Sequence, residues 1–346
     1  MSGVKTLTVS AEEGEQRLDR WLKRRFPQVT QGAVERLCRT GQIRVDGGRV
    51  KASSRVGPGM QIRLPPLPKG EGPAEAKAAN PAVAEADAKM IQSAVIYRDD
   101  QIIVLNKPAG LPSQGGSGLA ERHVDGLAEA LRFGLPDKPS LVHRLDKDTS
   151  GVLLLARTTK AARTLSEAFR HRSTRKIYWA AVAGVPSPRM GTIRYGLVKA
   201  GGPREEKMRC IPPGQVDKVE GAKRATTDYA VLEALASRAA WVALVPITGR
   251  THQLRAHMAE IGHPIVGDGK YGGSGQENLG DGWGAQLGGE ISRKLHLHAR
   301  SLTIAHPATG KPMTFTAPLP PHMAKTWKGF GWVEGDVPAD PFAEEA

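Results

Sequence analysis

Apolar residues near the start of the chain recur at helical spacing. Leu18, Trp21 and Leu22 lie three and four positions apart, which predicts an amphipathic helix with charged residues on its outer face. A second helix is expected after Thr30, whose side chain can cap it. Alternating apolar positions then predict short strands at 41–47, which ends in an Asp-Gly turn, and at 61–64. Residues 1–66 are therefore expected to form a compact module of two helices and a small sheet.

Two segments that flank residues 93–333 lack a regular pattern of apolar positions. Residues 67–92 are rich in Ala, Pro, Glu and Lys without a sustained apolar face, which indicates a linker that can form a transient Ala-rich helix. Residues 334–346 are acidic and Pro-rich and are expected to be loose.

Residues 93–333 hold apolar runs of strand length with fewer helical stretches between them. The expected strands are 94–97, 102–105, 152–156, 178–182, 230–232 and 241–245. The expected helices are 126–133, 160–169 and 252–260. Because strands outnumber helices, this segment is predicted to be a mixed α+β domain rather than a doubly wound sheet.

Charge indicates the kind of partner. The 346 residues include 49 Lys and Arg against 35 Asp and Glu, a net charge of +14. Residues 1–66 hold 13 of these basic residues and 6 of the acidic ones, so half of the surplus lies there. A polyanionic partner is expected, nucleic acid ahead of a membrane surface, although basicity alone gives only non-specific attraction to phosphate.

Composition also excludes several classes of protein. No apolar run approaches the roughly 18 residues of a membrane span, so an integral membrane protein is excluded. The first ten residues lack the apolar stretch of a secretory signal, and acidic residues follow them closely. Cys38 and Cys210, far apart in sequence, rule out a disulfide framework and a cysteine-based zinc site. A cytoplasmic location is therefore expected.

Two polar segments are candidates for a functional site. Residues 141–151 hold seven polar or charged residues ahead of an apolar strand, which fits a functional loop and a solvated turn equally well. In 246–257, Gly249 breaks the chain after a strand, Thr251 can cap a helix, and Arg255 lies one turn along it. Arginines at a helix start suit phosphate or carboxylate recognition, but a surface salt bridge is the commoner explanation.

The first of these segments resembles the signature loop of the RluA-type pseudouridine synthases. The matching block is His143-Arg144-Leu145-Asp146-Lys147-Asp148-Thr149-Ser150-Gly151. Further blocks follow the family's order at 105–110, 175–178, 248–255, 262–268 and 297–299, so the resemblance covers about residues 94–320. The basic N-terminal module resembles an S4 RNA-binding domain. The resemblance implies an α+β catalytic domain with a mixed, mainly antiparallel sheet, preceded by a small S4-like α/β RNA-binding module.

The same resemblance implies that uridine in RNA is isomerised to pseudouridine without a metal or cofactor. Asp146 takes the position of the family's essential aspartate, and it can either attack an electrophilic carbon or remove a ribose proton. Arg255 matches the arginine that pairs with this aspartate, keeping it ionised and oriented. Tyr178 matches the active-site tyrosine, whose ring can stack on the uracil.

Other basic residues are assigned to RNA binding. Arg144 matches the residue that supports the extruded nucleotide, since chemistry on a stacked base requires base flipping. Arg250 and His252 are expected to bind substrate. Eight basic residues of the S4-like module are expected to contact phosphates: Arg17, Arg20, Lys23, Arg24, Arg25, Arg36, Arg39 and Arg44.

The module order implies a structured ribosomal RNA substrate. The sequence Gln114-Gly115-Gly116-Ser117-Gly118-Leu119 and the end of the first module at Leu64-Pro65-Pro66 resemble the C-type pattern rather than the D-type pattern. C-type enzymes modify uridines around the peptidyl transferase region of large-subunit (23S-type) RNA, and D-type enzymes modify an intersubunit stem-loop. The expected partner is large-subunit ribosomal RNA or its precursor particle, and the protein is expected to be a monomer. The linker and a Gly-rich stretch at 267–289, expected to be a mobile surface insertion, depart from the family pattern.

Three other interpretations remain to be compared with the structure. A non-catalytic RNA-binding or ribosome-assembly protein would not need Asp146, Tyr178 and Arg255 together. A hydrolase built on His143 and Asp146 lacks a candidate nucleophile in a G-x-S-x-G turn. The histidine pairs 252/257 and 296/298 suggest a metal site, but no cysteine or carboxylate cluster completes one, so no metal is expected.

Overall fold

The computed structural model describes residues 4–10, 13–26, 28–67, 83–115, 122–200, 207–272 and 291–343. The chain divides into two compact units, residues 1–82 and 83–346, which are considered separately below. Within the described ranges, no helix is long and apolar enough to cross a membrane.

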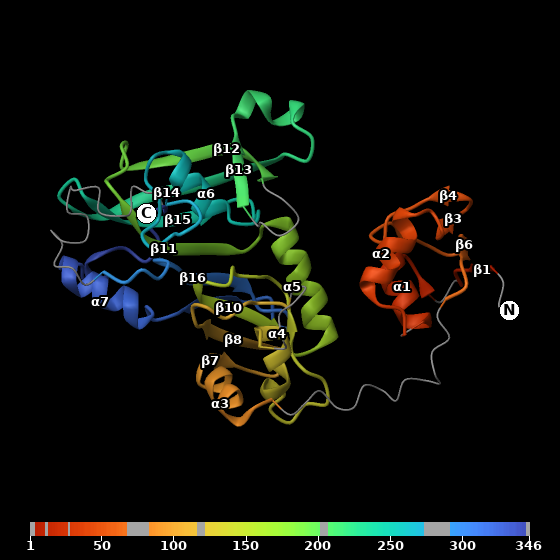
Figure 1. Cartoon of the computed structure of the whole chain (residues 1–346). Helices are drawn as coiled ribbons and strands as arrows, with labels where there is room; N and C mark the ends of the chain where they lie inside the picture. Colours follow the sequence, from red (N-terminus) through yellow and green to blue (C-terminus); the bar gives the residue numbers. More distant parts are fainter. Residues whose placement is uncertain are drawn as a thin grey trace. The chain divides into compact units, whose positions relative to one another are not determined.

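The N-terminal unit packs two helices, α1 (Leu18–Arg25) and α2 (Gln31–Arg39), against a small sheet (Figure 1). Its four strands run in the order β1 (Lys5–Thr8), β6 (Gln61–Leu64), β3 (Arg44–Val45) and β4 (Gly48–Arg49), and a separate pair joins β2 (Gln16–Arg17) to β5 (Arg55–Val56). Leu18, Trp21 and Leu22 are buried in the core of this unit, which confirms the predicted helical stripe. The predicted cap is also confirmed, because the Thr30 side chain accepts a hydrogen bond from the Ala33 backbone N–H.

A helix lies within the segment expected to be a linker. Helix α3 (Glu85–Ser93) belongs to the second unit, which begins at Val83, ahead of the expected boundary at 93. Ile91 is fully buried, and the Gln92 side chain donates a hydrogen bond to the Ala130 carbonyl. A buried apolar anchor makes α3 a packed helix rather than a transient one. The remainder of the expected linker, 68–82, lies outside the described residues.

The second unit is built on one large sheet, of 11 strands in the described residues. Its main path runs β13 (Lys207–Ile211), β12 (Met190–Ala200), β14 (Lys223–Leu235), β15 (Ala239–Pro246), β11 (Arg175–Ala183), β16 (Leu297–Ala305), β10 (Ser150–Ala156), β8 (Ile102–Lys107) and β7 (Val95–Arg98). Two more strands pair at its side, β17 (Pro312–Thr316) with β16 and β9 (Ser140–Leu141) with β10. β10 and β16 run parallel and the other strand pairs are antiparallel, which confirms the predicted mixed, mainly antiparallel sheet.

This sheet runs from β12 near the top of Figure 1 to β7 near the bottom, and helices cover both of its faces. Residues of β10 alternate between two cores, as strand geometry requires. Leu153 and Leu155 face α3 and α4 (Val124–Leu127), whereas Val152 and Leu154 face α5 (Thr159–His171). Three short 3₁₀ helices complete the described part: η2 (Ala128–Leu131), η3 (Pro213–Lys218) and η5 (Glu334–Asp336).

The other half of the sheet is covered in the same way. Val242 and Leu244 of β15 pack against α6 (Gln253–Glu260), and Trp241 packs on the opposite face against Trp327 of α7 (Pro321–Phe330). The aromatic rings of Trp241 and Trp327 meet edge to face at 5.4 Å. Both layers fix the strand ends from which the polar loops emerge.

The described part of the C-terminal tail is packed rather than loose. Asp340 accepts two hydrogen bonds from the Arg175 guanidinium at 3.0 and 2.8 Å, and Glu334 pairs with Arg300 at 2.8 Å. Phe342 packs against the core that contains α7. These contacts explain how acidic residues in the described part of a Pro-rich segment can be packed.

Candidate active site

The signature loop is held by its neighbours on both sides of Asp146. On one side, Leu145 is buried, and the Ser113 hydroxyl donates to its carbonyl at 2.7 Å and accepts from its N–H at 3.0 Å. On the other side, the Lys147 carbonyl accepts a hydrogen bond from the Gly110 N–H at 2.9 Å. Asp146 therefore projects from a backbone that is fixed independently of its own side chain.

A buried lysine strengthens this attachment. The Lys107 ammonium is fully buried and donates to the carbonyls of Pro108, Leu111 and Lys147 at 2.9, 2.8 and 3.0 Å. Burial lowers the pKa of Lys107 to about 7, and the nearby carboxylates of Asp148 and Asp146 act in the opposite direction. Lys107 thus connects the 105–110 block to the signature loop, a role that the sequence did not predict for it.

The last residue of the signature block allows two strands to approach. Gly151 has φ +107, and an added Cβ would lie 2.2 Å from the Ala299 carbonyl oxygen of β16. Next to it, the Ser150 hydroxyl and His298 Nδ1 are 2.8 Å apart. Only glycine fits this conformation and this contact, so the block places the loop directly beside β16.

His143 has a structural role. Its Nε2 accepts a hydrogen bond from the Leu154 N–H at 2.9 Å, and its ring stacks on Phe169 at 4.5 Å. Burial lowers the pKa of His143 to about 3, so the ring stays neutral and its acceptor nitrogen is already in use. The hydrolase interpretation with His143 as a base is therefore wrong.

Four of the residues predicted for the site do come together. The Asp146 side chain is 29% exposed, and its Oδ2 lies 3.9 Å from both His252 Nε2 and Arg255 Nη1. Tyr178 on β11 is partly buried, and burial together with the negative charge of Asp146 raises the pKa of its phenol, which keeps it neutral. Arg144 is exposed on the signature loop, and Arg250 is exposed near the start of α6. Neither forms an ion pair among the described residues.

Arg255 has a closer partner than the one expected. Its Nε and Nη2 donate to the two oxygens of Asp268, each at 2.7 Å, whereas Asp146 is 3.9 Å from the remaining Nη1. Arg255 and Asp268 are 5% and 2% exposed. The fork of the guanidinium is thus used to fix the arginine, and only its third nitrogen faces Asp146. Asp268, in the 262–268 block, is a site residue that the sequence did not predict.

The start of α6 also differs from the expectation. The helix begins at Gln253, and its N-cap is His252, with φ 51, rather than Thr251. The Gln253 side chain orders this end: its oxygen accepts from the Arg250 N–H and from the Thr248 hydroxyl, at 3.1 and 2.6 Å. Its amide nitrogen donates to the Thr226 carbonyl of β14 at 2.8 Å. The helix is therefore anchored to the sheet by an amide rather than capped by a threonine.

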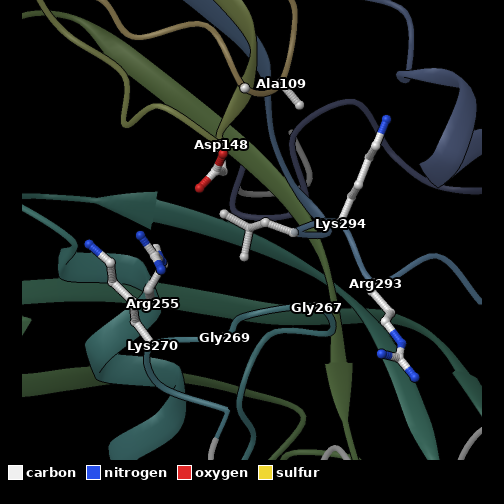
Figure 2. A pocket seen from close by; sticks show the side chains of 10 residues that line it. Ala109, Asp148, Arg255, Gly267, Gly269, Lys270, Arg293 and Lys294 are labelled. Carbon is white, nitrogen blue, oxygen red and sulfur yellow. The ribbon is translucent and has the colours of Figure 1, made fainter. Parts of the chain in front are cut away.

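A cleft of about 350 Å³ lies beside Arg255 (Figure 2). Its walls are Ala109, Gly110, Asp148, Arg255, Gly267, Gly269, Lys270, Arg293, Lys294 and Leu295. Figure 2 shows Arg255 and Lys270 side by side, with the Asp148 carboxylate across from them, while Lys294 and Arg293 extend along the other side. Lys270, Arg293 and Lys294 form no ion pair within the described part of the chain, so they add free positive charge that the sequence did not single out.

The histidines considered as metal ligands have protein partners. His298 is bonded to Ser150 and to the Ala317 carbonyl, and His296 to Thr326 and to the Lys294 carbonyl. Among the residues that the structure describes, no three His, Cys, Asp or Glu side chains are placed to hold a metal ion together.

The fold and this group of residues define an RNA pseudouridine synthase with an S4 domain. Residues 101–260 match the RNA pseudouridylate synthase family, and residues 16–62 match the S4 domain. The chain belongs to this family, since it is 35% identical over 328 residues to "Ribosomal large subunit pseudouridine synthase C" of Pasteurella multocida, covering 93% of this chain and 92% of the relative.

Other relatives agree with this assignment. The protein of the same name from Escherichia coli (strain K12) is 35% identical over 320 residues, covering 91% of this chain and 93% of the relative. Among solved structures, human RNA pseudouridylate synthase domain containing 4 is similar with a TM-score of 0.57 and 31% identity, over 70% of this chain and 95% of that one.

Proposed function

We propose that this enzyme converts specific uridines of large-subunit ribosomal RNA to pseudouridine, with Asp146 as the catalytic group. The RNA class is supported by relatives that carry the name "Ribosomal large subunit pseudouridine synthase C" and match more than nine-tenths of the chain. The C-type substrate, uridines around the peptidyl transferase region, is part of this proposal, as is a cytoplasmic location. Residues 116–119 of the C-type pattern lie outside the described residues.

The observation that carries the catalytic assignment is the convergence on one carboxylate. Asp146 from the signature loop, Tyr178 from β11 and Arg255 from α6 come from three separate blocks of sequence. The guanidinium beside Asp146 stabilises the negative charge that either nucleophilic attack or proton removal uses. A protein that only bound RNA would gain nothing from a negative charge placed among these cations.

We assign to the same arrangement the holding of a uridine taken out of the RNA stack. Base flipping costs a few kcal/mol and needs a group that supports the remaining helix. Arg144 is exposed two residues before Asp146 and is assigned this role, and the neutral ring of Tyr178 is assigned to stacking on the uracil.

Free cations are available to bind the RNA backbone. Three of them, Lys270, Arg293 and Lys294, lie along the cleft of the catalytic unit. Because their charges are not neutralised by carboxylates in the described ranges, each can pair with a phosphate and release a counterion. We assign them to positioning the strand that carries the target uridine.

The catalytic assignment is tested with the Asp146→Asn enzyme and a large-subunit RNA transcript. Turnover is expected to fall by about 10²–10⁴-fold, the usual effect of removing an acid–base group, while RNA affinity is retained. Asp100→Asn is the matched control, because Asp100 is an exposed aspartate in the β7–β8 turn, at the end of β8 far from the signature loop. Substantial turnover by Asp146→Asn would reject the assignment.

Wild-type activity is expected to persist in EDTA.

A further inference from the structure

One tyrosine contacts three residues of the group around Asp146. The Tyr271 hydroxyl is 3.0 Å from His252 Nδ1, and its ring lies 5.2 Å below the Arg255 guanidinium. Its backbone N–H donates to Asp268 Oδ1 at 3.2 Å. Nothing in the resemblance assigns Tyr271 a role, and its 19-residue separation from His252 hides the pair in the sequence.

The hydrogen bonds of the hydroxyl favour one of the two ring nitrogens of His252 as the one that carries the proton. A phenol has one proton to donate and lone pairs that accept. The Tyr271 oxygen already accepts the Met208 N–H of β13 at 2.8 Å, so its proton is available for Nδ1. Burial raises the pKa of Tyr271 to about 12, so the phenol keeps this proton. A histidine that accepts at Nδ1 carries its own proton on Nε2.

The protonated nitrogen then faces the reacting carboxylate. His252 Nε2 is 3.9 Å from Asp146 Oδ2, and the imidazole is buried. An N–H dipole directed at a carboxylate stabilises its charge, whereas a nitrogen lone pair in the same place would repel it. We propose that Tyr271 is a positioning residue: its hydroxyl holds His252 with the proton on Nε2, so that this N–H faces Asp146.

The backbone of His252 provides independent support. Its φ of 51 lies in the left-handed region, which is unfavourable for a residue with a Cβ. His252 occupies the N-cap position of α6 but makes no side-chain capping bond. Backbone strain of this kind persists where surrounding contacts require it, and it is frequent at functional sites. Here the strained backbone turns the ring toward Tyr271 and Asp146 rather than toward the helix end.

The test uses full-length wild type and Tyr271→Phe. This substitution keeps the ring beneath Arg255 and the backbone bond to Asp268, and removes the hydroxyl with its bonds to His252 and to the Met208 N–H. The imidazole nitrogens are observed by NMR with ¹⁵N-labelled histidine at about pH 8, where an unperturbed histidine is neutral, and His252 signals are assigned by their loss in His252→Gln. Wild type is expected to show a protonated Nε2 and an unprotonated Nδ1, and Tyr271→Phe a mixture of both forms.

Kinetics separate positioning from a purely structural role. In Tyr271→Phe, kcat is expected to fall roughly tenfold, the value of one neutral hydrogen bond, with the Kd for RNA unchanged. Tyr229→Phe is the matched control, since it removes another buried hydroxyl, which donates to the Pro188 carbonyl at 2.9 Å, away from Asp146. Its kcat is expected to equal that of wild type.

The outcomes that overturn the inference are distinct from those that overturn the proposed function, on which it rests. A proton on Nδ1 of wild-type His252 would overturn it without any substitution, even if Tyr271→Phe failed to fold. So would an unchanged kcat or an unchanged Nε2–H form in a folded Tyr271→Phe enzyme. The role of Asp146 itself stands or falls with Asp146→Asn, whichever nitrogen carries the proton.

Discussion

At the scale of single residues, the carboxylate that we propose to react, Asp146, is surrounded by groups that are fixed elsewhere. Arg255 is committed to Asp268 through two short hydrogen bonds, and Asp146 is left at 3.9 Å from the remaining nitrogen. An arginine bound only to Asp146 would have to break that pair to let the carboxylate react. With Asp268 as its anchor, Arg255 can supply positive charge without holding Asp146 in place.

Asp268→Asn is expected to destabilise the enzyme by about 3 kcal/mol, because it removes the buried carboxylate that anchors the Arg255 guanidinium through two hydrogen bonds. We also expect kcat to fall, since Arg255 is then free to form a direct pair with Asp146. Urea unfolding and steady-state turnover measure the two effects.

The control for this variant is Asp340→Asn. It removes a carboxylate that also binds an arginine through two hydrogen bonds, but the Arg175 and Asp340 side chains are 38% and 31% exposed. An exposed pair of this kind contributes at most about 1 kcal/mol. Equal destabilisation by the two variants would contradict the special role of Asp268.

The site residues that lie in family-like blocks of sequence could be predicted. The residues that hold them in place, Asp268 and Tyr271, could not. Asp146, Tyr178, His252 and Arg255 lie in blocks that resemble those of a family, and the structure brings them together. The pairing of Arg255 with Asp268 depends on which of two nearby carboxylates the backbone brings closer. Sequence spacing carries no information on that choice, nor on the bond from Tyr271 to His252.

At the scale of elements, the junction of β10 and β16 depends on neutral histidines. His298 donates from Nε2 to the Ala317 carbonyl, and its Nδ1 is bonded to the Ser150 hydroxyl of β10. His296, just before β16, is bonded to Thr326 of α7. Burial lowers the pKa of each to about 4, from an ordinary value of 6.5. Both rings must therefore stay uncharged for the strands and α7 to remain joined.

The free energy of unfolding is accordingly expected to decrease as pH falls from 6.5 toward 4. In that window the histidines of the unfolded chain take up protons that the folded protein cannot accept. Each contributes a slope of at most about 1.4 kcal/mol per pH unit. Urea unfolding between about pH 7 and pH 5, above the range where most carboxylates titrate, measures the slope.

His298→Gln is expected to reduce this slope by about one proton, while lowering stability at every pH. His171→Gln, a change at an exposed histidine that ends α5, should leave the slope unchanged. A slope that does not respond to His298→Gln would show that other groups control the acid sensitivity.

Elements with regular apolar patterns were predicted within a few residues, such as β8, β10 and α5. The hairpin β12–β13 was not predicted, because its strands mix exposed and buried positions irregularly. β16 was missed for another reason: it buries His298, a polar residue that is tolerated there only because both ring nitrogens are bonded. A polar residue at such a position interrupts the apolar pattern that would predict a buried strand.

At the scale of the whole molecule, fewer basic residues of the S4 domain are available to bind RNA than the sequence predicted. Of the eight predicted to bind RNA, Arg17 pairs with Asp19, and Arg24 and Arg25 pair with Glu13. The Arg44 side chain donates to two backbone carbonyls. Four exposed residues on α1 and α2 form no ion pair in the described ranges: Arg20, Lys23, Arg36 and Arg39.

Replacing these four residues with glutamine is expected to weaken RNA binding and to reduce the slope of log Kd against log salt by roughly 3. For each phosphate contact that is lost, the RNA keeps one counterion that binding would otherwise release. Each such contact contributes about 0.7–0.9 to the slope of log Kd against log salt. Titrations at several salt concentrations measure it. The double variant Arg17→Gln, Arg25→Gln removes cations already paired with carboxylates, so a smaller change is expected. An unchanged slope in the fourfold variant would mean that the S4 domain does not anchor the RNA.

The most direct test of the central claim is a map of pseudouridines in large-subunit ribosomal RNA, by carbodiimide modification and primer extension. Cells that lack this gene are compared with the same cells expressing wild type or Asp146→Asn. The account predicts that sites around the peptidyl transferase region disappear, and that wild type restores them while Asp146→Asn does not. An unchanged map in cells without the gene, or restoration by Asp146→Asn, would contradict it.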